Sequence, residues 1–318
     1  MWYNIKSYKF TTKVNCMIKT ASCAAEDAAY YFMCDDKLYI SHGCCLNTTA
    51  HFVEPEEIRA DNLDNVHKKI ITNEPIFSAF IPGEFDVCFA AKKCPSKTEI
   101  KNIKVGVSVC NLNCIMCETN DMNSCVEEKK NMFFKILNEY KKHGGYETLS
   151  INVCGEVFVW KEEILDYLEN LKHDEFQEVF IMTNGQLIDD ETIERLRNIK
   201  EVSILIDLSI DGVHKETLEK IRLGSSYEKT IEVMDKLKEA GLLKGCNYVV
   251  QKDNLDELED AYVFFKEKGV KVNFILQRVH SQIGGYFFTT PAIDVVMDKR
   301  RVNFVRNHPD TILFNEVK

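Results

Sequence analysis

Three cysteines lie within eight positions of the stretch VCNLNCIMCE, at Cys110, Cys114 and Cys117. Thiolates are common ligands of zinc ions and of iron–sulfur clusters. A loop with three thiolates can bind three irons of a cubane cluster, which leaves one iron without a protein ligand. An open iron offers a place for a substrate or cofactor, as the open position does in catalytic zinc sites. The spacing alone also allows a zinc site that a distant His or Cys completes.

The chain contains 13 cysteines among 318 residues. Seven of them precede residue 100, at Cys16, Cys23, Cys34, Cys44, Cys45, Cys88 and Cys94. The first 15 residues lack the apolar block of a secretory signal, and no apolar run approaches the roughly 20 residues of a membrane span. We therefore expect a soluble, cytoplasmic protein without a membrane partner, in which these thiols bind metal or clusters.

The charge of the chain bears on its partners. Fifty acidic and 40 basic residues give a formal net charge of −10. A polyanionic partner is disfavoured by this balance, because nucleic acids bind mainly through basic surfaces. We expect no nucleic-acid partner.

Runs of β-forming residues alternate with amphipathic helical stretches from about residue 102 to residue 276. The predicted strands are 104–109, 149–153, 179–182, 202–210, 247–250 and 272–276. The predicted helices are 122–143, 161–172, 188–198, 226–240 and a stretch from 255 that ends at Gly269. Six β/α units in strict alternation predict an α/β fold with a parallel sheet. Six units are too few for a closed eight-unit barrel, so we expect an open partial (β/α)6 TIM-like barrel with its chemistry at the carboxyl ends of the strands.

Three parts of the chain follow from this pattern. Residues 101–276 form the predicted barrel, and the cysteine triplet follows its first strand. Residues 1–100 show no such alternation and are a small cysteine-rich region better suited to binding metal than to forming its own hydrophobic core. Residues 277–318 are a C-terminal tail, with a predicted helix near 293–306, that is placed to cover the active site.

The triplet and the repeat together resemble the radical S-adenosylmethionine (radical SAM) enzymes, which carry a CxxxCxxC loop after the first barrel strand. The resemblance implies that Cys110, Cys114 and Cys117 hold a [4Fe–4S] cluster. It also implies that the open iron takes the amino and carboxylate groups of SAM. One electron, from a small donor such as flavodoxin or ferredoxin, then cleaves SAM to a 5′-deoxyadenosyl radical that abstracts a hydrogen atom from the substrate.

Further motifs of the family follow the next strands. Gly155-Glu156 after the second strand resembles the Gly-Gly-Glu stretch that binds the SAM amino group, with Cys154 in place of the first glycine. Asn184, in the sequence Thr-Asn-Gly, follows the third strand. Close approach of the backbone to a ligand is a physical reason for glycine at position 155.

Three more positions complete the cofactor site that the resemblance implies. Ser209 and Asp211, in the sequence Ser-Ile-Asp-Gly, match residues near the ribose of SAM. Arg222, in Arg-Leu-Gly-Ser, matches an arginine that can pair with the SAM carboxylate. Met116 stands where the family often has an aromatic residue near the adenine, and a thioether can fill that space.

The cysteines before the barrel resemble the SPASM and Twitch modules, which hold auxiliary [4Fe–4S] clusters in related enzymes. We expect one auxiliary cluster bound by Cys34, Cys45, Cys88 and Cys94, with Cys44 as the substitute for Cys45. The module precedes the barrel here, which departs from the usual order. A zinc knuckle and free thiols are the alternatives.

The resemblance also limits the function. The first hypothesis is an oxidoreductase-like radical SAM enzyme that modifies a peptide or protein. The second is a radical dehydrogenase or epimerase of a sugar-like small molecule. The third, a non-catalytic iron–sulfur electron-transfer protein, would have no use for the cofactor residues.

Overall fold

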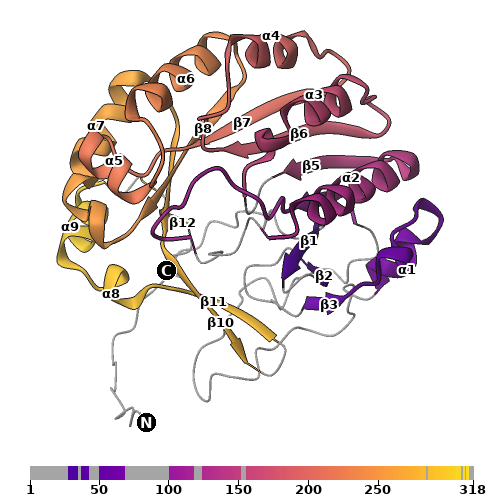
Figure 1. Ribbon diagram of the computed structural model, residues 1–318. Helices are drawn as coiled ribbons and strands as arrows, with labels where there is room; N and C mark the ends of the chain where they lie inside the picture. The colour runs from indigo at the N-terminus through magenta and orange to yellow at the C-terminus, as the bar shows by residue number, and fades with distance from the viewer. Residues whose placement is uncertain are drawn as a thin grey trace.

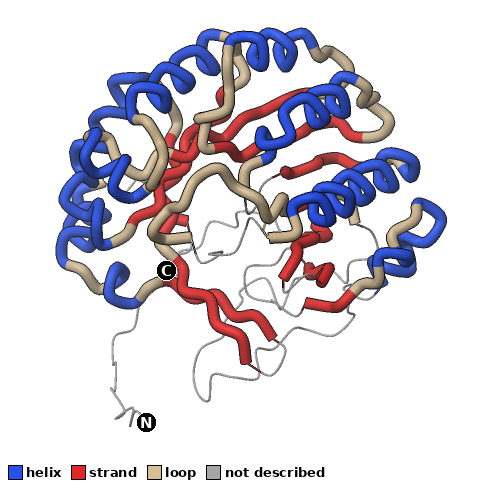
Figure 2. Tube along the Cα trace, viewed as in Figure 1, coloured by secondary structure: helices blue, strands red, loops and turns tan. Residues whose placement is uncertain are grey.

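The computed structural model describes residues 28–34, 37–42, 50–68, 100–117, 124–151, 155–283, 286–308, 311 and 313–314. In this part of the chain, six parallel strands follow one another in sequence order and curl into an open half-barrel (Figures 1 and 2). The strands are β4 (Asn102–Val105), β5 (Tyr146–Ile151), β6 (Phe176–Thr183), β7 (Ser203–Ser209), β8 (Leu243–Val250) and β9 (Val272–Leu276). The predicted partial (β/α)6 barrel is confirmed.

Helices cover the convex face of this sheet (Figure 1). They are α2 (Val126–His143), α3 (Lys161–Glu169), α4 (Asp190–Asn198), α5 (Lys215–Ile221), α6 (Tyr227–Glu239) and α7 (Leu258–Lys268). Two of them begin at side-chain caps, since Asp189 accepts a hydrogen bond from the Thr192 amide and Ser226 from the Lys229 amide. Among the described residues, no helix is long and apolar enough to cross a membrane.

Strand residues alternate between the two faces of the sheet. In β6, Val179 and Ile181 are fully buried against the helices, while Phe180 and Met182, which alternate with them, are only half-buried and face the concave side. The same alternation recurs in β4, β5 and β7. The hydrophobic core therefore lies between sheet and helices, and the concave side is free to carry polar side chains.

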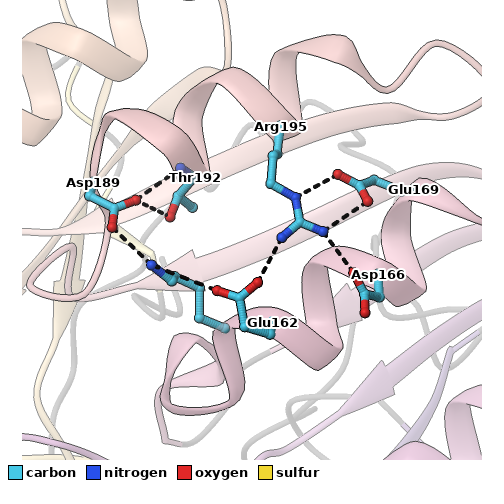
Figure 3. A network of polar contacts seen from close by, with 7 residues as sticks. Glu162, Asp166, Glu169, Asp189, Thr192 and Arg195 are labelled. Carbon is cyan, nitrogen blue, oxygen red and sulfur yellow. Dashed lines mark hydrogen bonds and ion pairs between the residues drawn. The ribbon is translucent and has the colours of Figure 1, made fainter.

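The outer surface carries a network of exposed charges (Figure 3). Arg195 on α4 donates to Glu162, Asp166 and Glu169 of α3, with N–O distances between 2.7 and 2.9 Å. Lys161 continues the network to Asp189 at 2.8 Å. These pairs link neighbouring helices far from the concave face.

Part of the cysteine-rich region extends the sheet beyond β4. Strand β1 (Ala28–Cys34) pairs parallel with β4, and β2 (Lys37–His42) and β3 (Ala50–Phe52) follow in antiparallel order. The turns η1 (Pro55–Glu57) and η2 (Ala60–Asn62) and helix α1 (Leu63–Lys68) complete it. Tyr31, Ile40 and Ile58 are fully buried in the same core as the barrel residues. The sequence pattern did not predict this extension.

The C-terminal tail adds a hairpin and a further edge strand. Strands β10 (Arg278–Ile283) and β11 (Tyr286–Pro291) pair with each other, and β12 (Leu313–Phe314) pairs parallel with β9. The predicted helix near 293–306 is present as two, α8 (Ile293–Val296) and α9 (Lys299–Asn307). Asp298 separates them because its side chain caps α9 by accepting a hydrogen bond from the Arg300 amide.

Candidate active site

The cysteine loop, residues 106–117, begins earlier than predicted. Strand β4 ends at Val105, and Ser108 has φ 57°, in the left-handed region that breaks a strand. Two backbone hydrogen bonds then fix the loop to the segment after α5: the Asn113 amide donates to the Leu223 carbonyl at 3.1 Å and the Ile115 amide to the Ile221 carbonyl at 2.9 Å. The loop is therefore anchored on the side opposite its own strand.

The three thiols of this loop are partly buried and interact electrostatically with one another. Burial raises the pKa of Cys110 and raises the pKa of Cys114 to about 11, while the positive charge of Arg222 acts in the opposite direction on both. Within the described ranges, no three Cys, His, Asp or Glu side chains converge as a single metal ion would require. A cubane cluster does not need such convergence, because each thiolate binds a different iron.

Gly155 lies against this loop, in the turn before the short 3₁₀ helix η3 (Val157–Trp160). Its φ of +98° is in the region that favours glycine, and a Cβ there would lie 2.6 Å from the Val109 carbonyl oxygen and 2.9 Å from the Ser108 nitrogen. The next amide, that of Glu156, donates to the same Val109 carbonyl at 2.7 Å. Only glycine permits this contact between the two turns.

The Glu156 side chain is fully buried and holds the turn after β6. Its carboxylate accepts hydrogen bonds from the Asn184 amide at 2.7 Å, from the Thr183 hydroxyl at 3.0 Å and from the Phe158 amide at 3.1 Å. Burial raises the pKa of Glu156 to about 7, against the effect of these donors. The carboxylate thus faces other protein groups and positions Asn184.

Asn184 connects that turn to the cysteine loop. Its side-chain nitrogen donates to the Asn111 side-chain oxygen at 2.8 Å and lies 3.9 Å from the Cys110 sulfur. Its side-chain oxygen accepts a hydrogen bond from the Gln186 amide, and Gly185 between them has φ 78°. The carboxyl ends of β4, β5 and β6 therefore meet at the cysteines.

Asp211 and Arg222 form a buried ion pair on the other side of the loop. Arg222 Nη2 lies 2.7 Å from Asp211 Oδ2, and the Asp211 side chain is completely buried. Asp211 Oδ1 accepts a hydrogen bond from the Val249 amide at 2.7 Å, which ties the pair to β8. Arg222 Nε is buried and has no hydrogen-bond partner among the described residues.

A polar row crosses the concave face from the carboxyl end of β7, through the middle of β8, to the start of β9. Ser209, Asn247 and Asn273 are register partners on β7, β8 and β9, and Asn273 donates to the Asn247 side-chain oxygen at 3.0 Å. Sequence reasoning identified Ser209 but missed the two asparagines, and it also missed Asn111. Asn111 could have been found from its place just after the predicted strand 104–109, and the two asparagines from being polar residues near the starts of the predicted strands 247–250 and 272–276.

The structure thus brings most of the expected site residues to one edge of the sheet. Cys110 lies beside Asn184, the charge of Arg222 acts on Cys110 and Cys114, and Cys117 interacts with the other two thiols; Met116 is a partly buried member of the loop. Cys34 ends β1, but its side chain is outside what the structure describes. The other expected auxiliary ligands, Cys44, Cys45, Cys88 and Cys94, also lie outside the described residues, as does Cys154.

Comparison with known proteins agrees with this arrangement. The family model of the Radical SAM superfamily matches residues 105–265. A probable GTP 3′,8-cyclase of Methanococcus aeolicus is 25% identical over 211 residues, which is 64% of this chain and 68% of that protein. The antilisterial bacteriocin subtilosin biosynthesis protein AlbA of Bacillus subtilis is 27% identical over 165 residues, which is 51% of this chain but only 36% of AlbA.

Two solved structures show limited similarity. The structure of anSMEcpe with bound AdoMet has 23% sequence identity and a TM-score of 0.47, and the match covers 66% of this chain and 57% of that one. Streptococcus suis SuiB bound to S-adenosylmethionine has 22% identity and a TM-score of 0.47, with 66% and 47% covered.

Proposed function

Because the chain belongs to the radical SAM superfamily, we propose that it is an enzyme that cleaves S-adenosylmethionine reductively and uses the radical to modify a peptide. When bound, a [4Fe–4S] cluster supplies the electron that converts S-adenosylmethionine to methionine and a 5′-deoxyadenosyl radical. The observation that carries this proposal is the anchored loop with its three thiols, packed against Gly155 and Asn184.

The residues present fit such a cluster and its cofactor. Cys110, Cys114 and Cys117 would supply the thiolates, and the buried Arg222 cation offsets part of their negative charge. Because Gly155 packs closely on Val109 and has no side chain, its backbone would be accessible to the cofactor. Ser209 lies in the polar row that offers hydrogen bonds to a ribose, and Met116 lies beside the third cysteine to pack against a purine.

Two classes of substrate are suggested by the relatives, and the charge of the concave face favours the peptide. The described strands present Lys104 and Lys244 to that face with Glu178 and Asp207 as opposite charges, and Lys271, just before β9, adds one more positive charge near Asp207. Lys244 Nζ already lies 3.9 Å from Asp207 Oδ2 and 3.8 Å from the centre of the Phe180 ring. A nucleoside triphosphate needs a clear excess of positive charge, whereas a peptide does not.

We further propose an auxiliary cluster bound by Cys34, Cys45 or Cys44, Cys88 and Cys94. The parallel pairing of β1 with β4 supports it, since Cys34 then ends a strand that runs to the same edge of the sheet as the cysteine loop. Such a cluster would accept an electron from a substrate radical, which suits a net oxidation. A flavodoxin or ferredoxin would reduce the first cluster.

The test is to follow deuterium into 5′-deoxyadenosine with anaerobically reconstituted enzyme. Deuterated peptides, GTP and sugar alcohols are offered in parallel, and label transfer from a peptide alone is expected. Deuterium transfer from GTP or from a sugar alcohol would instead identify that compound class as the substrate and contradict the peptide proposal. Iron content tests the auxiliary cluster. About eight irons per chain are expected, and a value of about four would rule out the auxiliary cluster.

A further inference from the structure

Arg222 is held in one orientation by its surroundings. It directly follows α5, its side chain is about nine-tenths buried, and its Nη2 is engaged by Asp211 Oδ2 at 2.7 Å. Asp211 is itself fixed at both ends: its carboxylate accepts from the Val249 amide, and its carbonyl oxygen accepts from the buried Asn254 side chain at 2.9 Å. The ion pair therefore fixes the Nη2 end of the guanidinium and leaves its Nε–H for another partner.

The same arginine lies against the cysteine loop. The residues on either side of it, Ile221 and Leu223, accept the two backbone hydrogen bonds that anchor the loop. Arg222 is thereby held next to the loop that carries the three thiols. Its Nε–H is buried and unpaired among the described residues, which is costly unless a partner completes it.

We infer that Arg222 is a positioning residue of the cluster site: oriented by Asp211, it offers its Nε–H to the cluster sulfurs and its positive charge raises the reduction potential of the cluster. Net charge and hydrogen bonds to sulfur are the main protein influences on such potentials. Reduction adds negative charge, so a fixed cation nearby favours the reduced state. This inference rests on the proposed function only in requiring that the loop hold a [4Fe–4S] cluster.

The role differs from that of a direct ligand of the S-adenosylmethionine carboxylate, which the family resemblance suggested. A residue that acts only through the cofactor would change cofactor affinity and leave the potential of the cofactor-free cluster unchanged. A residue acting on the cluster would change the potential even without cofactor. The two roles can therefore be separated.

The experiment is a redox titration of the cofactor-free cluster, followed by EPR, with iron content measured in the same samples. Arg222→Gln is expected to lower the midpoint potential, and Arg222→Lys, which keeps the charge but loses the Nε–H, to give an intermediate value. Lys220→Gln is the matched control, because it removes one positive charge from an exposed side chain two residues away and should leave the potential unchanged.

Several outcomes would overturn the inference. An unchanged potential in Arg222→Gln together with at least tenfold weaker S-adenosylmethionine binding would make Arg222 a cofactor ligand. Equal shifts in Arg222→Gln and Lys220→Gln would show a general charge effect. If Arg222→Gln does not assemble a cluster, a potential in Arg222→Lys equal to that of the wild type would contradict the inference. A wild-type protein without any cluster would instead refute the proposed function.

Discussion

Two buried polar networks in the described part of the chain differ in how completely they are paired. The mouth network, at the carboxyl ends of the strands, consists of Glu156, Thr183, Asn184, Asp211 and Arg222, and it leaves Arg222 Nε without a described partner. The tyrosine–histidine network lies beneath β1: the hydroxyls of Tyr31 and Tyr140 are 2.7 Å apart, and His67 Nε2 is 2.6 Å from the Tyr140 hydroxyl.

Their charges differ as well. The tyrosine–histidine network is neutral, since burial lowers the pKa of His67 to about 4 and raises the pKa of both tyrosines. It joins β1, α1 and α2 and needs no ligand to be complete. The mouth network buries charged side chains beside three thiols, and one of its donors, Arg222 Nε, is unpaired among the described residues. Buried polar groups are normally satisfied, so the unpaired Arg222 Nε beside the thiols supports placing the functional site at the mouth network, whereas the tyrosine–histidine network has a structural role.

The largest effect is expected from Gly155→Ala, which should separate the mouth network from the cysteine loop. The new methyl group would overlap two backbone atoms and strain a positive φ, so we expect a loss of about 4 kcal/mol in the free energy of unfolding, together with loss of the cluster. Gly145→Ala is the control, because it has φ +82° but open space around its Cβ position. Equal losses in the two variants, measured by anaerobic urea unfolding, would show that the contact with Val109 is unimportant.

The pH dependence of the mouth network comes next. Because the folded-state pKa of Glu156 is raised from 4.5 to about 7, its contribution to stability is full below pH 4.5 and is lost as the pH rises through 7. That loss amounts to about 3 kcal/mol. In Glu156→Gln this slope should disappear from urea midpoints measured between pH 4.5 and 8. A slope identical to that of the wild type would mean that Glu156 does not titrate there.

The tyrosine–histidine network should respond in the opposite direction. His67 has a lowered folded-state pKa, so its contribution is full above pH 6.5 and is lost as the pH falls toward 4. We expect the wild type to lose about 2 kcal/mol between pH 6.5 and pH 5 through this group, and His67→Gln to lack that component. Cluster content should be unaffected at neutral pH. Loss of the cluster in His67→Gln would place this network in the functional site after all.

The smallest effect is expected for the exposed network of Figure 3. Arg195→Met removes a guanidinium from three carboxylates that are 36–70% exposed, so the loss should be about 1 kcal/mol or less and should shrink with added salt. Unfolding at low and high ionic strength measures it. A larger, salt-independent loss would show that burial alone does not separate important from unimportant charges in this protein.

The sequence predicted the barrel well because strands β4 to β9 and most of their helices carry clear periodicity. It missed β1, whose stretch AAYYFMC has no alternation of apolar and polar residues, and it missed α5, which is only seven residues long. Cysteine spacing and turn motifs located the mouth. They could not show that Asp211 and Arg222 pair with each other, because that contact depends on how the segment after α5 packs against β8.

We propose above all that a [4Fe–4S] cluster held by the cysteine loop cleaves S-adenosylmethionine. The most direct measurement is 5′-deoxyadenosine and methionine formed by anaerobically reconstituted protein with dithionite, quantified by mass spectrometry. We predict formation by the wild type and by Cys125→Ser, an exposed cysteine outside the loop, and none by the variant with Cys110, Cys114 and Cys117 all replaced by alanine. Persistent 5′-deoxyadenosine in that triple variant, or none from a wild-type protein with its full iron content, would contradict the claim.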